Sequence, residues 1–395
     1  MRNLPSVLAA SLLALGLCVA GASDAWAFDP PAPIGFKFDP VGPLELTGGL
    51  DGYGYLLTGE GSAGNHQLLG SEHSSGGEFL NGLVQVRKTD GLVRFSVAVG
   101  STTSLTLGTA PSRSSAQTLS TGALYAAAIG LQPSPSFKIG VGLLSSVEGY
   151  ESSLNWSNNS LFTTDMFYVE NSKSVGVTAS YSPGPVAIKV VFGDGYNTGT
   201  FNFLQVLVTD TIDAKNSLNI YGAANLGRTD PNAHFYGSSS LPYRRSRVGS
   251  GPLSAANLVN SDMLGAYYST TLGNLTLTPE LQYVYALVDH KIGLDRYSSN
   301  LGAALFANYK FGKSDYSIGG WGEYFASHGP DFWFLNPGAK GYGVAISPTW
   351  QHKRFFVRGD LGLLHLTTIG DGPGYGSNGA HRNQAIAVLG GGVLF

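Results

Sequence analysis

Nine charged side chains occur one at a time within segments whose alternate residues are apolar. They are Arg87, Arg94, Lys138, Lys189, Glu280, Lys310, Glu323, Arg358 and Asp360. A charge placed in this way in a β-strand lies on the face opposite the apolar side chains. Such a face would be unstable against lipid but is solvated in a wet lumen, so these residues are candidates for lining a pore. Their chemistry would be the attraction and exclusion of ions.

A second group of charges lies in the segment 147–173, which is rich in Asn and Ser. Its acids are Glu148, Glu151, Asp165 and Glu170. A segment of this length can fold inward and narrow a channel, where its acids would face basic residues on the wall and set a size and charge preference. A mobile surface loop is the alternative. Counting both groups, charges of the two signs nearly balance, so the sequence identifies neither a solute nor an ion selectivity.

The residue types that usually carry catalysis or bind metals form no such pattern. The eight histidines are scattered, and none has another His or a close pair of carboxylates at metal-ligand spacing. The Gly-rich segment 370–376 lacks the Lys-Ser/Thr of a phosphate-binding loop, and no G-x-S-x-G elbow occurs. His365 is the lone candidate for a lipase site on a barrel wall. We therefore predict no enzyme, no metal and no cofactor.

Segments of alternating polarity must position these charges. Around the turn Thr89-Asp90-Gly91, Leu80, Val84 and Val86 alternate with polar residues on one side, and a similar pattern follows from Val93. Two strands joined by a D-G turn form a hairpin with one apolar and one polar face. We predict strands at 44–57, 78–88, 91–101, 117–129, 136–146, 174–182, 185–196, 202–210, 217–227, 261–273, 275–287, 298–312, 315–327, 341–353, 355–368 and 383–395.

The connections between these segments alternate between short and long, with 197–201 as one exception. Short periplasmic turns and long external loops are typical of outer-membrane barrels. Because backbone groups in lipid must be paired, the sheet must close on itself. The predicted fold is an all-β, transmembrane antiparallel β-barrel of about 16 strands, within a range of about fourteen to eighteen. A barrel of this width encloses an aqueous channel, and the many lumen-side glycines and alanines also argue against a filled centre.

The N-terminal residues predict export. Arg2 precedes an apolar run, and Ala25-Trp26-Ala27 has the small residues of a cleavage site. We predict a signal peptide at 1–27, a proline-rich periplasmic lead-in at 28–43 and the barrel at 44–395. The single cysteine, Cys18, lies in the leader, so the mature chain has no cysteine for a disulfide framework or a thiolate metal site.

The composition favours a membrane barrel over other classes of protein. Only 12% of the residues are charged, about half the share in a typical soluble domain. After the leader no uninterrupted apolar stretch is long enough to span a membrane as a helix. The net charge of −3 excludes a polycationic nucleic-acid-binding surface. A soluble β-sandwich with an aromatic core is the alternative for the aromatic residues.

The segment from Phe137 to Thr198 carries a family resemblance. It contains VGLLSSVEGYESSLNWSNNSLF and then SVGVTASYSPGPVAIKVVFGDGYNTG, with GGLDGYGY and the hairpin of 81–100 upstream in the same order. These motifs resemble the putative β-barrel porin-2, OmpL-like, family of bacterial outer-membrane proteins. The resemblance spans most of the mature chain and rests on short, glycine-rich motifs. It implies a porin-type channel for small solutes, without a named substrate or a catalytic motif.

The expected protein is a bacterial outer-membrane porin that lets small hydrophilic solutes or ions diffuse passively. An adhesin or structural barrel acting through its external loops is the alternative, and the lead-in is too short for the plug of a gated importer. Other expected partners are outer-membrane lipid, the barrel assembly machinery, which would read the terminal Phe395, and a possible homotrimer. Lipopolysaccharide is a further one, because it could bind Arg244, Arg245 and Arg247. No nucleic acid is expected.

Overall fold

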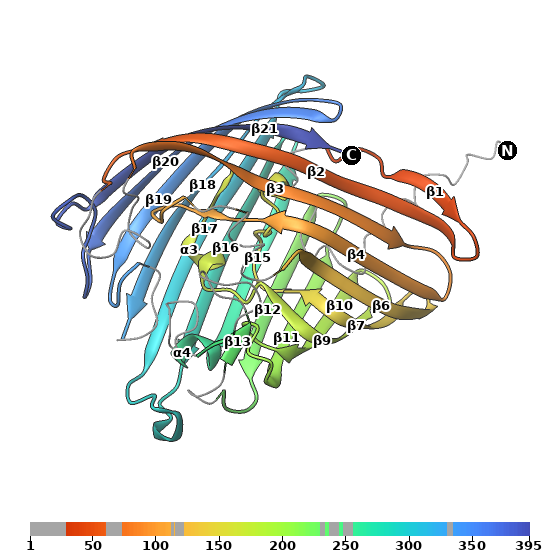
Figure 1. The fold of residues 1–395 in the computed structure, drawn as a ribbon, viewed down its shortest axis with the longest axis horizontal. Helices are drawn as coiled ribbons and strands as arrows, with labels where there is room; N and C mark the ends of the chain where they lie inside the picture. Colours follow the sequence, from red (N-terminus) through yellow and green to blue (C-terminus); the bar gives the residue numbers. More distant parts are fainter. Residues whose placement is uncertain are drawn as a thin grey trace.

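The computed structural model describes residues 29–60, 73–111, 114, 122–229, 256–329 and 335–395, with the backbone of two short strands at 234–236 and 245–247. Sixteen antiparallel strands form one closed barrel (Figure 1). They are β2 (Gly42–Leu57), β3 (Ser75–Lys88), β4 (Val93–Thr102), β6 (Leu124–Ser134), β7 (Phe137–Ser145), β9 (Lys173–Tyr181), β10 (Val186–Asp194), β11 (Phe201–Thr211), β12 (Asn216–Asn225), β15 (Asp262–Leu272), β16 (Leu275–Ala286), β17 (Ser298–Lys310), β18 (Tyr316–His328), β19 (Lys340–His352), β20 (Phe355–Thr368) and β21 (Asn383–Leu394). The predicted fold class is therefore confirmed.

The barrel closes between its first and last strands. Each strand pairs with the next one along the chain, and β21 pairs with β2 from Gly49–Leu394 to Leu57–Ile386. Beyond that ladder, Gly48 and Phe395 exchange two backbone hydrogen bonds, of 2.7 and 2.9 Å. Closure satisfies the backbone groups that an open sheet would leave unpaired in lipid.

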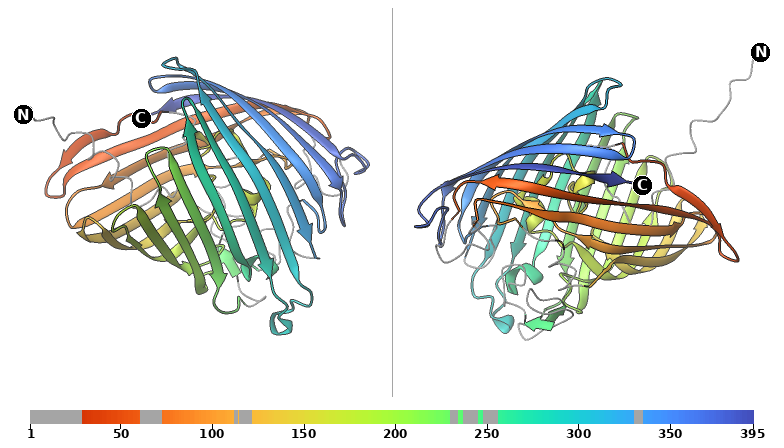
Figure 2. Two further views of the ribbon diagram at one scale, coloured as in Figure 1. Left: turned by 180° about the vertical axis from the view of Figure 1, so that it is seen from behind. Right: turned by 45° about the horizontal axis from the view of Figure 1, so that its top comes forward.

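The segment predicted as a lead-in is partly β-sheet. Strand β1 (Ile34–Phe38) pairs with Gly42–Leu46 at the start of β2. It lies on the same edge of β2 that β21 occupies further along. β1 therefore covers the part of that edge that the C-terminal strand does not reach, and it projects from one end of the barrel (Figure 2).

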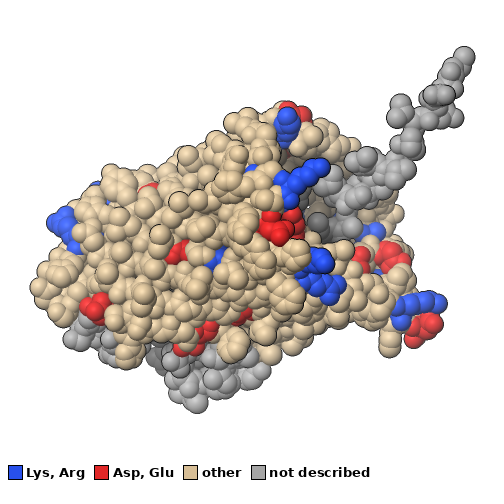
Figure 3. Space-filling model, turned by 90° about the horizontal axis from the view of Figure 1, so that it is seen from above, with Lys and Arg blue, Asp and Glu red and all other residues tan. Residues whose placement is uncertain are grey.

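Apolar side chains cover the outside of the barrel because each strand alternates in polarity. In β20, Val357, Leu361 and Leu363 are exposed, whereas Arg358 and Asp360 are buried on the inward face. The barrel wall in Figure 3 is mostly uncharged, and the charged side chains visible there lie mainly toward the end that carries β1. An uncharged outer wall is what lipid requires.

Two local expectations differ from the structure. Most of the predicted turn at 130–135 is strand instead, because β6 runs on to Ser134, with Pro133 inside it, and the turn to β7 (Phe137–Ser145) lies at 135–136. Leu80, expected on the outer face, is buried, because a bulge at Asp51–Gly52 shifts the register of β3 (Ser75–Lys88). Both errors come from irregular strand geometry, which simple alternation does not encode.

The remaining described elements are short and belong to connections. They are β5 (Leu105–Thr106), η1 (Asn155–Ser157), β8 (Phe162–Thr163), α3 (Asp165–Tyr168), β13 (His234–Tyr236), β14 (Arg245–Arg247), α4 (Ala256–Val259) and η3 (His290–Ile292). In the described part of the chain, none of the helices has the length and apolar character to cross a bilayer. The predicted signal peptide at 1–27 and the side chains of the Arg244–Arg247 cluster lie outside the described residues.

Candidate functional site: a loop docked inside the barrel

Residues 146–172, which join β7 to β9, lie inside the barrel, and we call them the lumen loop (Figures 1 and 2). The loop contains η1, β8 and α3, and most of its side chains are buried. β8 pairs in parallel with β5, which belongs to the connection after β4. The Thr106 and Thr163 hydroxyl oxygens lie 3.0 Å apart across this pair. Of the two interpretations of this segment, the structure shows the inward-folded one.

Three acids on the barrel wall hold the backbone of the lumen loop. The Tyr150 N–H donates to Glu280 at 3.1 Å, the Leu161 N–H to Asp360 at 2.9 Å, and the Asp165 N–H to Glu323 at 2.9 Å. An irregular loop enclosed in a barrel has backbone donors without a ladder partner, and each needs an acceptor. The three wall acids, from β16, β20 and β18, supply those acceptors.

Further polar wall groups complete the attachment. The Trp321 indole N–H donates to the Phe162 carbonyl oxygen at 2.9 Å, and the Asn300 amide donates to Asp165 at 2.9 Å. Arg358, which is fully buried, donates to the Asn155 carbonyl oxygen at 3.2 Å. Contacts from β17, β18 and β20 therefore fix one face of the loop.

Inward-facing glycines make room for the docked loop. An added Cβ would lie 2.0 Å from the Asn159 oxygen at Gly319, and 2.2 Å from the Met166 Cγ at Gly302. At Gly362 it would lie 2.5 Å from a Leu107 methyl carbon. Glycines on the lumen side predict an unfilled centre, and at these three positions that prediction is wrong. Here they permit close approach of a second backbone.

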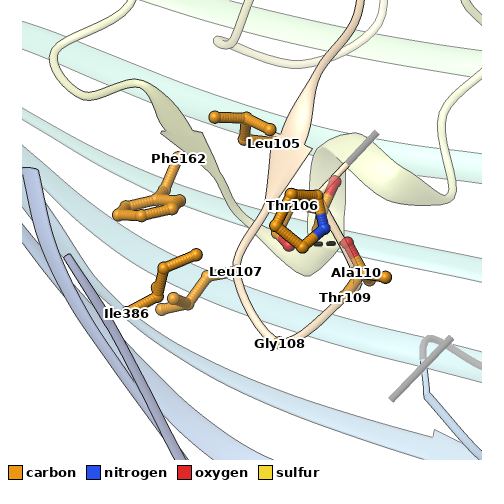
Figure 4. A pocket seen from close by; sticks show the side chains of 9 residues that line it. Leu105, Thr106, Leu107, Gly108, Thr109, Ala110, Phe162 and Ile386 are labelled. Atoms are coloured by element: carbon orange, nitrogen blue, oxygen red, sulfur yellow. Dashed lines mark hydrogen bonds between the residues drawn. The ribbon is translucent and has the colours of Figure 1, made fainter. Parts of the chain in front are cut away.

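Apolar packing extends across the lumen from the loop to the wall. The Tyr150 ring lies 4.7 Å from the Phe306 ring and 5.6 Å from the Tyr267 ring, measured between centroids. Near β21, Phe162, Leu107 and Ile386 lie together beside a small pocket (Figure 4). The loop thus fills part of the lumen that the sequence predicted to be a wide aqueous channel.

Burial keeps protons on the acids of the lumen loop. It raises the pKa of Glu148 from its usual 4.5 to about 8, and that of Glu151 likewise to about 8. Burial raises the pKa of Asp165, and burial followed by the nearby Glu280, Glu148 and Glu151 raises that of Glu170 well above its usual range. Glu148, Glu151 and Glu170 therefore present little negative charge at neutral pH.

The loop acids contact neutral polar groups, whereas the sequence suggested that they would face basic residues. Glu148 accepts from the Asn171 N–H at 2.8 Å, and Glu151 from the Thr164 N–H at 3.0 Å. The Gln282 amide on β16 donates to Glu170 at 2.8 Å. The loop docks on a wall whose titratable groups include Glu280 and Glu323, and protonated acids fit such a wall better than charged ones.

The nine charged residues predicted to line the lumen all occupy inward-facing positions in their strands. They fall into two groups that differ in exposure. Glu280, Glu323, Arg358 and Asp360 are sealed from water beneath the lumen loop, with at most 5% of their surface exposed. The others are partly exposed: Arg87, Arg94, Lys138, Lys189 and Lys310. Arg87 pairs with Glu45 at 2.6 Å, and Lys310 pairs with Asp29.

No group of three or more His, Cys, Asp or Glu residues among those that the structure describes is arranged to hold a metal ion. His365 is exposed on the outer face, and its Nδ1 lies 2.7 Å from the Asn383 side-chain oxygen.

The family model described as "Putative beta-barrel porin-2, OmpL-like" matches residues 43–395. The chain belongs to this porin family. Among curated proteins none matches it in sequence. The match covers the whole barrel of the porin, including the lumen loop and the wall that anchors it, and it places the porin in the bacterial outer membrane.

Solved structures share the fold of this porin at low sequence identity. OmpT of Vibrio cholerae, an outer membrane protein, aligns with a TM-score of 0.55 and 10% identity over 89% of this chain and 97% of that one. Its trimer form aligns with a TM-score of 0.55 and 9% identity over 89% and 99%. OmpF of Salmonella typhi in complex with daunomycin gives a TM-score of 0.52 and 12% identity over 92% and 100%. These likenesses show the barrel fold.

The sequence did not identify the glycines that make room for the loop. Three of these glycines occupy inward-facing positions in their strands: Gly302, Gly319 and Gly362. A glycine inside a strand often marks a place where another part of the backbone approaches closely. Leu105 and Leu107 are also buried, although the strand pattern predicts an external loop for their segment. Their apolar character is the one signal that argued against solvent exposure.

Proposed function

We propose that this porin is a passive channel for small hydrophilic solutes or ions, and that the lumen loop sets its cross-section. The observation that carries the proposal is the loop docked inside a sixteen-stranded barrel by three wall acids. A barrel of this strand number is wide enough for an aqueous path, and a fixed internal loop narrows it without closing the sheet. Transport then follows the concentration gradient and needs no energy source.

The proposal is for a channel and not an enzyme. Catalysis would need a nucleophile, a base and an oxyanion donor set in mutual reach. On the outer wall, His365 contacts the Asn383 amide, which is neither an acid that orients a base nor a nucleophile. Family membership supports the same conclusion.

Single-channel conductance in a planar bilayer tests the proposal directly. The refolded protein, checked for its β-content and for heat-dependent electrophoretic mobility, should give steady, stepwise, ohmic currents. Replacing residues 152–168 with a short Gly-Ser linker should raise the conductance while the barrel stays folded. A folded wild-type barrel that inserts and passes no current would overturn the channel function and favour an adhesin acting through its external loops.

The remaining partners are proposed on chemical grounds. The apolar outer wall fits outer-membrane lipid. The C-terminal aromatic Phe395, which pairs with Gly48 at the seam, would be read by the barrel assembly machinery during insertion. Lipopolysaccharide at the external loops and a homotrimer, as in the trimer form of the Vibrio protein, are further proposals. A cleaved leader at 1–27 would deliver the chain to this membrane.

A further inference from the structure

The docked lumen loop removes more negative than positive charge from the water-accessible inner wall. The inward acids Glu280, Glu323 and Asp360 are covered by the loop, and Glu148 and Asp165 of the loop itself are buried. Arg358 is the one predicted wall cation that is sealed with them. Positive and negative charges are nearly equal in number in the sequence. On the wall that a permeating ion can reach, positive charges therefore outnumber negative ones.

The cations that remain form an arc on one side of the barrel, which we call the basic arc: Arg87 on β3, Arg94 on β4, Lys138 on β7 and Lys189 on β10. Lys138 and Lys189 both lie opposite Ser180 of β9, so they share one inward row. Two strand spacings separate their backbones, which is about 10 Å. Arg87 lies opposite Ser96, two residues from Arg94 on the same face of β4.

The strands that carry the basic arc add little negative charge. β4, β6, β7 and β9 contain no acidic residue, and the acids of β3 and β10, Glu78 and Asp194, lie near the opposite ends of those strands. Glu45 on β2 pairs with Arg87 and offsets that one charge. Arg94 and Lys138 lie opposite Gly130 and Ser180 in the ladder, and Asp90, the acid in the turn beside Arg94, is paired with Lys88.

The wall across the lumen, from β15 to β18, is nearly uncharged at the same end. Its inward, partly exposed side chains on β15 to β18 are hydroxyls and amides, such as Thr271, Thr276 and Asn308. Lys310, which pairs with Asp29, is the charged inward residue at that end of β17. The lumen at this end therefore has a cationic side and a neutral polar side.

We infer that the basic arc makes this channel selective for small anions. The inference rests on the proposed channel function and names the class of solute that passes. Charges spaced by about 10 Å act together, because that is close to the screening length at 0.1 M salt. A narrow lumen bounded by low-dielectric walls concentrates their field and raises the local concentration of anions above that of cations.

The reversal potential of single channels in a roughly tenfold KCl gradient around 0.1 M tests the inference. The wild-type protein should show a higher permeability for chloride than for potassium. The double variant Lys138→Gln/Lys189→Gln should lower the chloride-to-potassium permeability ratio by at least about twofold. Lys313→Gln, which removes the same charge in the exposed turn between β17 and β18, should leave the ratio unchanged.

The outcomes separate this inference from the proposed function. Channels that conduct but prefer potassium, or whose ratio is the same in the double variant and in Lys313→Gln, would refute anion selectivity and leave the porin function intact. A folded protein that conducts no current would refute the channel function, and the selectivity with it. The additional variant Arg94→Gln, which alters a separate strand, should move the ratio in the same direction.

Discussion

Asp360 shows how one side chain on a barrel wall fixes a distant loop. Its Oδ1 accepts from the Ser160 hydroxyl at 2.7 Å and from the Leu161 N–H at 2.9 Å, across 200 and 199 residues of sequence. All of these groups are buried, so water does not replace the carboxylate when it is removed.

Asp360→Ala should loosen the lumen loop locally. Removing the acceptor leaves the Leu161 N–H unsatisfied, at a cost of about 1–3 kcal/mol, which corresponds to about 5- to 150-fold faster hydrogen exchange of that amide. Mass spectrometry of peptides covering residues 155–165 measures this rate. Asp315→Ala, in the exposed turn before β18, is the matched control and should leave it unchanged. Equal exchange in both variants would contradict the anchoring role.

Gly319 tests whether the wall glycines are needed for docking. A Cβ at this position would lie 2.0 Å from the Asn159 oxygen, so Gly319→Ala should displace η1 and the residues that follow it. We expect faster proteolysis within 152–168 and a changed single-channel conductance. Gly322→Ala is the control, because its Cβ would meet nothing closer than a Val344 methyl at 3.8 Å. A response to Gly322→Ala as large as that to Gly319→Ala would argue against a specific fit.

At the scale of elements, the lumen loop couples docking to pH. Glu148 and Glu151 have a pKa of about 8 in the docked loop, against a usual value of 4.5, so the docked state binds protons more tightly than a released one. Docking is therefore strongest below about pH 4.5 and weakens as the pH rises through about 8. Glu280 and Glu323 face the loop from the wall, so each proton lost by the loop places a charge near further acids.

The single-channel conductance should change with pH in the direction that weaker docking implies. Raising the pH from 5 to 9 should increase the single-channel conductance or its fluctuations, because the loop leaves the wall more often. The variant Glu148→Gln/Glu151→Gln should flatten this response, whereas Asp371→Asn in an exposed external loop should keep it. A response that is the same in all three proteins would exclude the loop acids as its cause.

The strands of this protein were predictable because their signal is local. β16 and β20 begin where alternation placed them, at Leu275 and Phe355, because side-chain direction in a strand repeats every two residues. The docking of the lumen loop was not predictable in this way. Tyr150, Leu161 and Asp165 meet acids that are 130, 199 and 158 residues away, and no local pattern records such pairings.

For the candidate site, the sequence identified residues but not their surroundings. Glu280 and Glu323 have the inward parity that alternation predicted, yet they hold backbone N–H groups of the loop. Whether Arg94, Lys138 and their neighbours line a conducting path remains a prediction. Alternation gives the face on which a side chain lies, whereas its exposure depends on what else fills the lumen.

At the scale of the whole molecule, barrel stability depends on the seam between β2 and β21. Deleting residues 393–395 removes the pairs of Leu50 and Gly49 with Val393 and Leu394, and the Gly48–Phe395 exchange. We expect a lower folded fraction after refolding in detergent, read from the mobility difference between heated and unheated samples. Phe395→Leu keeps the backbone pairs and should refold nearly as well as the wild type. Equal folding of the truncated protein would show that the seam closes without these residues.

The Phe395→Leu substitution also separates closure of the seam from recognition of the C-terminal residue in the cell. If the aromatic ring of Phe395 serves the assembly machinery, Phe395→Leu should refold in vitro and yet accumulate poorly in the outer membrane. Normal accumulation would show that the ring is not read during insertion. The two measurements separate the stability of the finished barrel from the efficiency of its delivery.

The fit between the lumen loop and the opposite wall also constrains how this protein can diverge. A larger residue at Gly302, Gly319 or Gly362 needs loop atoms that lie farther from the wall, and a shifted loop backbone needs new acceptors in place of Asp360 and Glu323. Substitutions on either side would therefore be tolerated mainly in pairs. Among descendants of this chain, residues 150–166 should covary with positions on β17, β18 and β20. A loop transplanted between relatives should dock only when those wall positions are transplanted with it.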